Sequence, residues 1–478
     1  MNSKLRIRCL SALSLLALAA SYQEAKAQFD PTALSKNGVR INTVTTAVPF
    51  LRINPDARAG GMGDVGVATP ADVNSLFLNP ANMAFNERDF GFSVSFTPWL
   101  KALVNDIYMG GLTGYYKVKE KQTVQIGLKY FSLGNITFTD YNGAEIGNFR
   151  PQEFSLDAGY ARKLSNDFSI AATIRFIYSN LSNVGVDGIA TFPGYAGAAD
   201  ISWMYYKQFG KGKMKHDLRV GMNISNIGNK ITYTRNAQNA DYIPTNLRIG
   251  LGYTLNIDQK NAVGLYMDIS RLLVPSPQPA TIPYELGGDT INPNYDKNGV
   301  PGADWRQKSP ITGIFTSFGD APGFLYMDAN GKVQRVKGSK SKEELQETTF
   351  AIGAEYMYNK QFGVRFGYFY EPRNKGNRQF VTAGLTVKYS IVGLNFSYLI
   401  PTGIQRNPLD NTLRFSLLFD FFKGGNKAKA NSASPSGVSL VEPAPKKKEK
   451  KVKEDAPAPE SEISEPPKEM KLAPIEPK

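Results

Sequence analysis

Apolar residues alternate with small or polar residues in about fourteen short segments between residues 90 and 422. Residues 168–178, 247–255, 362–370 and 413–421 show the alternation most clearly. Because successive side chains of a strand point to opposite faces, each segment predicts a strand with one apolar and one polar side. None of these segments contains the run of ~18 apolar residues that a membrane-spanning helix needs. The pattern therefore predicts a transmembrane β-barrel.

A soluble β-sandwich is the alternative, because its strands alternate in the same way. The polar face of a sandwich meets water and usually carries Lys, Glu and Thr. Here that face is rich in Gly, Ser and Asn with scattered Arg and Asp, and aromatic residues gather at the strand ends. Small and polar side chains suit a crowded barrel lumen, so we favour the barrel.

The fold class that we predict is all-β, a 14-stranded antiparallel transmembrane barrel with an N-terminal lumen hatch and long extracellular loops. The predicted strands are residues 90–98, 107–118, 122–133, 153–163, 167–180, 199–208, 217–227, 246–257, 261–270, 349–358, 361–371, 379–389, 391–400 and 411–422. Outer-membrane barrels have short turns in the periplasm and long loops outside, and an even strand number leaves both termini in the periplasm. We therefore expect an integral outer-membrane protein with periplasmic termini.

Residues 1–27 have the composition of a secretory signal peptide. Basic residues at positions 4, 6 and 8 precede the apolar residues 10–20, and residues 25–27 (Ala-Lys-Ala) offer a cleavage site. The one cysteine, Cys9, lies inside this peptide. The mature chain therefore has no thiol for a disulfide, a nucleophile or a metal site.

Bulk composition does not decide the class, since a mean hydropathy of −0.30 is expected where only half of each strand faces lipid. The 24 Tyr and 28 Phe residues are more informative, because they supply a lipid-facing surface and interfacial girdles. The net charge of +14 comes with no nucleic-acid-binding motif, so we expect no nucleic-acid partner. Lys and Arg at strand ends and in loops suit contact with outer-membrane lipid and anionic lipopolysaccharide.

The chain offers no recognisable catalytic constellation. His216 is the only histidine, and we place it in a short turn over residues 210–216. The glycine-rich residues 60–66 follow no predicted strand, so they do not form a dinucleotide-binding loop. We find no Walker loop and no carboxylate-rich metal motif. We therefore expect no enzyme, no catalytic residue, no cofactor and no metal site.

The most distinctive local sequence precedes the barrel, in residues 49–85. It contains Pro-Asp-Ala-Arg-Ala-Gly-Gly-Met-Gly at 55–63, Gly-Val-Ala-Thr at 66–69 and Asn-Pro-Ala at 79–81. These motifs resemble the PorV proteins of the Bacteroidetes type IX secretion system, within the wider group of FadL-like fourteen-stranded barrels. The resemblance covers residues from about 40 to 422. It rests on sequence motifs in the N-terminal part and on the predicted strand pattern in the rest.

The resemblance implies that residues 28–89 hold the lumen hatch, and an ordinary periplasmic lead-in is the alternative. Glycine suits a hatch, because a loop inside a barrel must turn tightly and approach strand backbones. We expect the hatch charges to pair with lumen-facing Arg175, Arg248, Arg365 and Asp420, since unpaired charges in a confined space are costly. The candidate hatch residues are Asp56, Arg58, Gly60, Gly61, Gly63, Asp64, Asn79 and Pro80.

The resemblance also implies a function. PorV-like proteins are shuttles that bind the C-terminal signal domains of secreted cargo proteins at the type IX translocon barrel. They deliver this cargo to a surface sortase or attachment complex, which links it to lipopolysaccharide. The alternative is a FadL-like channel for uptake of hydrophobic small molecules, with an apolar pocket under the loops. An outer-membrane lipid-modifying enzyme would need a catalytic constellation that we do not find.

The predicted extracellular loop over residues 271–348 is too long to be a simple connection. Its first half is rich in proline and its second half in apolar residues. Exposed apolar side chains in such number indicate either a partner surface or a loop folded onto the barrel mouth, and both interpretations stay open. The candidate cargo or partner residues are Tyr284, Tyr295, Trp305, Ile314, Phe315, Phe318 and Phe324.

The barrel region, residues 90–422, is followed by a change of composition. Residues 423–478 are rich in Lys, Pro, Ala and Glu and contain no aromatic residue. Such a sequence cannot bury a core, so we expect a disordered periplasmic tail. A contact of this tail with the cell wall or with a periplasmic subunit is the alternative.

Overall fold

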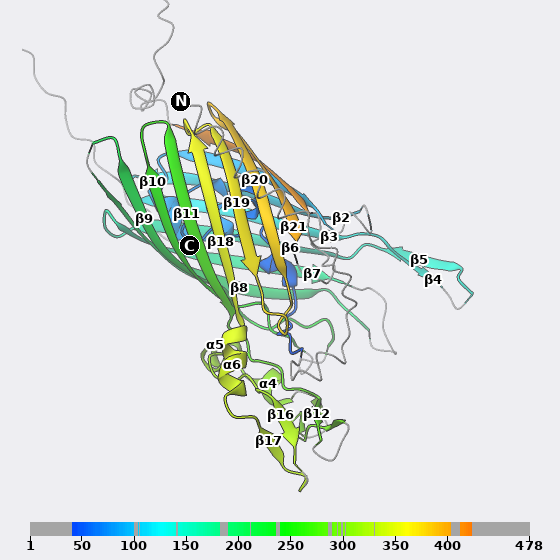
Figure 1. Cartoon of the computed structure of the whole chain (residues 1–478). Coiled ribbons are helices and arrows are strands. Elements are labelled where there is room, and N and C mark those ends of the chain that lie inside the picture. Colours follow the sequence, from blue (N-terminus) through cyan, green and yellow to red (C-terminus); the bar gives the residue numbers. More distant parts are fainter. Residues whose placement is uncertain are drawn as a thin grey trace, which may run out of the picture. The chain divides into compact units, whose positions relative to one another are not determined.

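The computed structural model describes residues 41–99, 104, 106–139, 142–181, 190–210, 212–235, 240–284, 289–293, 295–297, 300–301, 303–328, 330–402 and 412–422. The predicted signal peptide and C-terminal tail lie outside these residues. Within the described chain, fourteen strands form a closed antiparallel barrel in sequence order, and the first strand also pairs with the last (Figure 1). The predicted 14-stranded antiparallel barrel is confirmed.

The barrel strands follow the predicted segments closely. They are β1 (Phe90–Pro98), β2 (Ile107–Lys119), β3 (Gln122–Leu133), β6 (Gln152–Lys163), β7 (Phe168–Asn180), β8 (Gly194–Phe209), β9 (Lys215–Gly228), β10 (Asn246–Asn256), β11 (Asn261–Leu272), β18 (Thr348–Tyr358), β19 (Phe362–Tyr370), β20 (Gln379–Tyr389), β21 (Val392–Pro401) and β22 (Leu413–Phe421). The largest difference is in β8, which begins at Gly194 rather than at residue 199. Its first residues are mostly small and show no apolar alternation, yet Gly194 pairs with Ser179 of β7.

Exposure alternates along each strand, as the alternation of residue types predicts. Ile174 on the outward face of β7 is 69% exposed, whereas the neighbouring Thr173 on the inward face is 1% exposed. The outward face is apolar and meets lipid, and the inward face is small or polar. Among the residues described, no helix is both long enough and apolar enough to cross a membrane.

Short and long connections gather at opposite ends of the barrel. The end with the short connections, here called the turn end, carries residues 120–121, 164–167, 210–214, 257–260, 359–361 and 390–391. Tight hairpins need left-handed backbone, and Asn359, Lys360 and Ser390 have φ values of 53°, 54° and 55°. His216 is not in a turn as predicted, because β9 begins one residue before it. Its Nδ1 lies 2.6 Å from the hydroxyl of Tyr253 on β10.

The opposite end of the barrel, the loop end, carries secondary structure of its own. The hairpin of β4 (Ile136–Thr139) and β5 (Glu145–Phe149) extends from the barrel (Figure 1). Residues 273–347, here called the loop segment, contain β12 (Thr281–Pro283), β13 (Asp289–Ile291), β14 (Asp296–Lys297), β15 (Val300–Pro301), α4 (Ala303–Gln307), α5 (Pro310–Thr316), β16 (Leu325–Met327), β17 (Val333–Arg335) and α6 (Ser339–Gln346). The described residues of the loop segment therefore form several short helices and strands.

Residues 47–85, here called the plug, pack against the inward faces of the strands. They contain η1 (Pro49–Arg52), α3 (Ala57–Gly60), η2 (Val73–Phe77) and η3 (Pro80–Phe85), where η marks a 3₁₀ helix. Val48 and Phe50 of the plug share one apolar cluster with Ile177 of β7 and Phe380 of β20. Burial of these side chains from water stabilises the plug inside the barrel.

The chain passes through the lumen from the loop end to the turn end. Before the plug, the backbone N–H of Asn42 donates to the carbonyl of Asn374 at the loop end, 2.9 Å away. After the plug, the N–H of Asp89 donates to the carbonyl of Phe421 at the turn end, also 2.9 Å away. An even strand number brings together only the start of β1 and the end of β22. The first described residues thus lie at the loop end, and the N-terminus itself lies outside the described residues.

Candidate functional site

The polar centre of the plug begins at Asp56, which caps α3. Its carboxylate accepts hydrogen bonds from the backbone N–H groups of Arg58, at 3.1 Å, and Ala59, at 3.0 Å. Asn74 of η2 donates its side-chain amide to the same carboxylate at 2.9 Å. Asp56 therefore stabilises the helix start and ties it to the next helical turn of the plug.

Arg58 connects the plug to the barrel wall. Its guanidinium lies 3.0 Å from Asp72 of the plug and 3.0 Å from Glu355 of β18. Glu355 also accepts a hydrogen bond from Arg365 of β19 at 2.7 Å. All four side chains are buried, and buried charges are costly unless they are paired. The network therefore favours one position of the plug over displaced ones.

Two further carboxylates join the plug to the wall. Asp64, at the end of the glycine-rich stretch, forms an ion pair with Arg414 of β22. Asp268 of β11 accepts hydrogen bonds from the backbone N–H groups of Gly66, at 2.9 Å, and Val67, at 3.1 Å. The plug is thus held by β11, β18 and β22, which are distant from it in sequence.

The predicted partners of the hatch charges were largely wrong. Arg175 pairs within the wall, with Asp157 of β6 and Asp200 of β8. Asp420 accepts a hydrogen bond from Tyr115, and Arg248 donates to the backbone carbonyl of Asp64 rather than to its carboxylate. Arg365 joins the network, but through Glu355. For Arg175 and Arg365 the physical reason is that each lies directly opposite a carboxylate on an adjacent strand, Asp157 and Glu355 respectively.

Glycine allows close backbone contact between plug and wall. A Cβ atom on Gly61 would lie 2.8 Å from the Cα of Gly384 of β20. A Cβ atom on Gly367 of β19 would lie 2.0 Å from the carbonyl carbon of Met62. Gly63 has a φ of 70°, which side chains disfavour, and Gly60 packs against Arg414. Any larger residue at these positions would push the plug away from the wall.

The Asn-Pro-Ala motif fixes the second half of the plug. The Asn79 amide nitrogen donates to the carbonyl of Val67 at 2.9 Å and to that of Trp203 of β8 at 3.1 Å. Pro80 begins η3, and its carbonyl accepts a hydrogen bond from Gln125 of β3 at 3.0 Å. These contacts tie the plug to strands opposite the Arg58 network.

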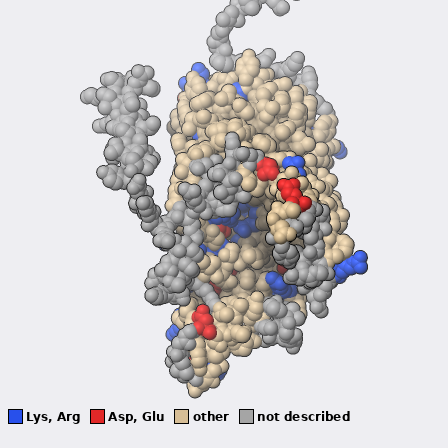
Figure 2. Space-filling model, turned by 90° about the vertical axis from the view of Figure 1, so that its right-hand side faces the viewer, with Lys and Arg blue, Asp and Glu red and all other residues tan. Residues whose placement is uncertain are grey.

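The loop segment is fastened to the barrel mouth by charges that we did not single out in the sequence. Arg271, near the end of β11, pairs with Glu344 and, at 2.9 Å, with Glu347. Lys375, between β19 and β20, lies 2.6 Å from Glu343 and 3.0 Å from Glu347. The face of the molecule in Figure 2 is hollowed, and Lys and Arg side chains lie inside the hollow.

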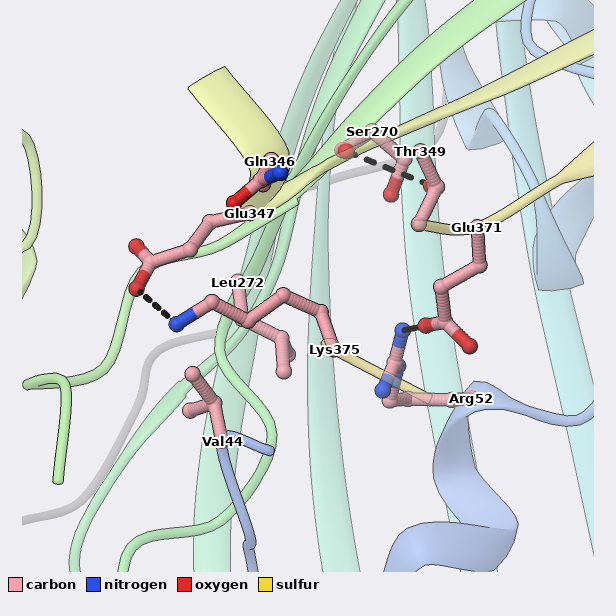
Figure 3. Close-up of a pocket in the computed structure, with 9 residues that line it drawn as sticks. All are labelled: Val44, Arg52, Ser270, Leu272, Gln346, Glu347, Thr349, Glu371 and Lys375. Atoms are coloured by element: carbon pink, nitrogen blue, oxygen red, sulfur yellow. Dashed lines mark hydrogen bonds and ion pairs between the residues drawn. The ribbon is translucent and has the colours of Figure 1, made fainter. Parts of the chain in front are cut away.

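A cleft of about 400 Å³, which includes some open solvent, lies where plug, strand ends and loop segment meet. Figure 3 shows that Lys375 points toward Glu347 and Arg52 toward Glu371. These two ion pairs line the cleft: one includes Arg52 of the plug, and the other includes Glu347 of the loop segment. The plug and the loop segment therefore meet at this cleft. Its lining residues are Val44, Arg52, Ser270, Leu272, Gln346, Glu347, Thr349, Glu371 and Lys375.

Glu371 is the acid of this cleft with the strongest preference for its charged form. Burial opposes the charge, but two hydrogen bonds from Arg378, of 2.7 and 2.9 Å, together with the charges of Arg378 and Arg52 outweigh it. The pKa of Glu371 is therefore below its ordinary value of 4.5. By contrast, burial raises the pKa of Glu347 even though Lys375 and Arg271 lie beside it.

Acidification should loosen the segment that carries Glu371. A carboxylate with a lowered pKa stabilises the fold above its unfolded-state pKa, and this contribution is lost as the pH falls through the folded-state value. We expect the backbone amide hydrogens of residues 371–378 to exchange with deuterium faster in Glu371→Gln than in wild type at about pH 5, where the carboxylate is charged. The ratio of the two exchange rates should approach one as the pH falls below 4.5. A ratio that stays constant over this range would contradict the prediction.

The seven candidate cargo residues do not form one surface. Trp305 is 8% exposed, and it packs in one cluster with Tyr242 and Val274. The Tyr242 hydroxyl lies 2.8 Å from the carbonyl oxygen of Trp305 and fixes α4. Tyr284, Tyr295, Ile314 and Phe324 are half-buried.

Three apolar side chains at α5 are exposed. Phe315 is 76% exposed, Ile311 66% and Phe318 54%, and we call these three residues the α5 surface. The guanidinium of Arg271 lies 5.4 Å from the ring centroid of Phe318. The α5 surface is therefore held next to the charged junction of the loop segment.

Sequence reasoning missed the wall residues that receive the plug. Glu355, Asp268 and Arg414 each occupy an inward position of a barrel strand. The sequence signal that could have identified them is a charged residue at a position that alternates with the apolar, outward-facing residues of a strand. That signal identifies the face but not the partner, because the partner comes from a segment far away in sequence.

A closed antiparallel barrel with an apolar outer face and a lumen filled by its own N-terminal segment defines a plugged transmembrane barrel of the outer membrane. The family model of Type IX secretion system protein PorV matches residues 35–279, slightly more than half of the chain. The chain belongs to this family and is an outer-membrane component of type IX secretion. Among curated proteins, none matches the chain.

Several solved structures are similar to this chain. The toluene transporter TodX of P. putida matches with a TM-score of 0.41 and 11% identity, over 76% of this chain and 98% of that chain. The toluene transporter TbuX of Ralstonia pickettii matches with a TM-score of 0.39 and 11% identity, over 77% and 98%. A FadL homologue of Pseudomonas aeruginosa matches with a TM-score of 0.34 and 10% identity, over 80% and 99%.

Proposed function

We propose that this protein is a cargo shuttle. In this role it binds the C-terminal signal domains of secreted proteins at the type IX translocon barrel and delivers them to the sortase or attachment complex at the cell surface. The observation that carries the proposal is the filled lumen: buried ion pairs and glycine contacts hold the plug against the wall. A barrel filled in this way is suited to present a docking surface, and family membership supports a role in secretion.

We place cargo contact on the α5 surface. Exposed phenylalanines beside a charged junction resemble the centre of a protein interface, where aromatic anchors contribute most of the binding energy. The ion pairs of Arg271 and Lys375 hold the loop segment in place, so little ordering free energy is lost on binding. The remaining candidates, Tyr284, Tyr295, Ile314 and Phe324, are half-buried and are not part of the α5 surface.

Replacing both phenylalanines should abolish cargo capture. Burying one Phe contributes about 1.5–3 kcal/mol, so Phe315→Asp with Phe318→Asp should weaken binding by a factor of at least about one hundred. We would measure binding of a purified C-terminal signal domain to the full chain in detergent. The control is Ile291→Asp, which makes the same kind of change at a residue of the loop segment that is 71% exposed.

Both variants should migrate on gels as heat-modifiable folded barrels. If the double variant binds cargo with the affinity of wild type, the α5 surface does not contact cargo. Loss of binding in the Ile291→Asp control as well would show that the loop segment responds as a whole.

A channel for hydrophobic small molecules is less well supported. The cavity beside α3, about 210 Å³ with some open solvent, is lined by the charged residues Asp56, Arg58 and Asp72 together with apolar ones. An apolar ligand prefers a mostly apolar lining. A hydrophobic molecule that co-purifies inside the lumen would favour this alternative.

The division of the chain also remains a proposal. We propose a signal peptide over residues 1–27, an N-terminal segment with the lumen hatch over 28–89, the barrel over 90–422 and a disordered periplasmic tail over 423–478. The turn end would then face the periplasm. We propose no catalytic role, because the charged clusters described above hold the plug and the loop segment in place.

A further inference from the structure

Basic residues gather at the turn end, on the neighbouring strands β2, β3 and β6. Lys119 ends β2, Lys121 lies in the following turn, and Arg162 and Lys163 end β6. Lys119 is paired with Gln122 of β3, and Gln122 with Arg162. The backbone N–H of Lys163 donates to the carbonyl of Lys121 at 2.9 Å. Four cations therefore start from strand ends that are ~4.8 Å apart, and we call them the basic row.

Three side chains of the basic row are available to a ligand outside the barrel. Lys119, Lys121 and Arg162 are exposed, whereas Lys163 follows the outward Arg162 on β6, is half-buried, and has its ammonium 4.7 Å from the ring centroid of Phe85 of the plug. Within the part of the chain that the structure describes, none of the four forms an ion pair. Glu120, in the same turn, contributes a single negative charge.

The basic row lies at the edge of the lipid-facing surface. Two positions further into the barrel, Tyr116 is paired with Val124, and Val124 with Tyr160. These outward side chains are 41%, 39% and 41% exposed. Tyrosine marks the boundary between hydrocarbon and headgroups, and two strand positions correspond to ~7 Å. The cations therefore reach the level of lipid phosphates.

We propose that the basic row binds the phosphate of an anionic glycerophospholipid in the leaflet that the turn end faces. Guanidinium and ammonium groups are the donors that phosphate prefers. The outward Arg162 and Lys119 lie two strand spacings apart with Gln122 of β3 between them, a separation that one headgroup can bridge. Lipid explains the adjacent tyrosines, whereas an acidic protein segment or a soluble anion does not require them. This inference is independent of cargo binding.

The test compares two variants of the full chain with equal loss of charge. The first replaces the basic row by Lys119→Gln, Lys121→Gln, Arg162→Gln and Lys163→Gln. The matched control replaces four lysines of the loop segment by Lys332→Gln, Lys337→Gln, Lys340→Gln and Lys342→Gln. Native mass spectrometry would count the dioleoylphosphatidylglycerol, phosphatidylcholine and lipopolysaccharide molecules retained from mixed micelles.

Wild type and the loop-segment control should retain phosphatidylglycerol in preference to phosphatidylcholine. The basic-row variant should lose at least about fivefold of this retention, and added salt should lower it in wild type. Equal phosphatidylglycerol retention by all three proteins would overturn the proposal. Selective loss of lipopolysaccharide would also overturn it, since the ligand would then belong to the other leaflet. If the basic-row variant does not assemble, Lys119→Gln with Arg162→Gln gives the same comparison.

Discussion

Glu355→Ala should free the plug and destabilise the barrel by about 3 kcal/mol. Glu355 is 5% exposed and is the carboxylate that Arg58 of the plug and Arg365 of the wall share. Its removal leaves two buried guanidinium groups with incomplete partners, because Arg58 keeps Asp72 and the carbonyl of Pro70, and Arg365 keeps its hydrogen bond to Thr386. Urea unfolding in lipid vesicles, followed by heat-modifiable gel migration, would measure the loss.

A matched control for this variant is Glu120→Ala, at an exposed residue of the β2–β3 turn. A surface substitution of this kind should change the unfolding free energy by less than about 0.5 kcal/mol. Replacing Arg58, Glu355 and Arg365 by Met, together with Asp72→Asn to remove the charge left beside Arg58, should recover much of the lost stability, since an apolar replacement of a buried ion network is often neutral. An unchanged urea midpoint for Glu355→Ala would show that the network does not hold the plug.

Gly367→Leu should expel the plug from its position and open the lumen. A Cβ atom at Gly367 would lie 2.0 Å from the carbonyl carbon of Met62 and 2.2 Å from the nitrogen of Gly63. These are backbone atoms, so no side-chain rotation relieves the clash. We expect ion conductance in planar bilayers and protease cleavage within residues 56–70, neither of which wild type should show.

The control for the steric prediction is Gly110→Leu on the outward face of β2. A Cβ atom at Gly110 meets no heavy atom within 4 Å, so this variant should assemble and stay closed like wild type. Closed behaviour of Gly367→Leu would mean that the plug does not contact β19 as described. Conductance of both variants would indicate a leaky wall rather than a displaced plug.

The plug and the loop segment meet at the cleft near the barrel mouth. Arg52 of the plug and Glu347 of the loop segment line one cleft, and Lys375 and Glu371 complete the contact between them. Displacing the plug should therefore also disturb the loop segment that carries the α5 surface. For a shuttle, this arrangement would keep the docking surface rigid as long as the lumen is filled.

The sequence by itself determined the barrel. Alternation of residue types predicts which side chains face lipid and which face the lumen, because a strand has a period of two whatever its neighbours are. The strand positions, their number and the division into short turns and long loops followed from this local rule. The glycines at 60, 61 and 63 also indicated close backbone contact before any partner was known.

Only the tertiary structure decided what the buried charges do. The partners of Arg58 and Asp64 are Glu355 and Arg414, which lie about 300 and 350 residues away, and no local pattern encodes such a choice. The structure also shows that Trp305, a candidate binding residue, is buried. It places the chain before the plug at the loop end of the barrel. Pairing across a lumen depends on which segments are brought together in space, and that is a property of the closed barrel rather than of any stretch of sequence.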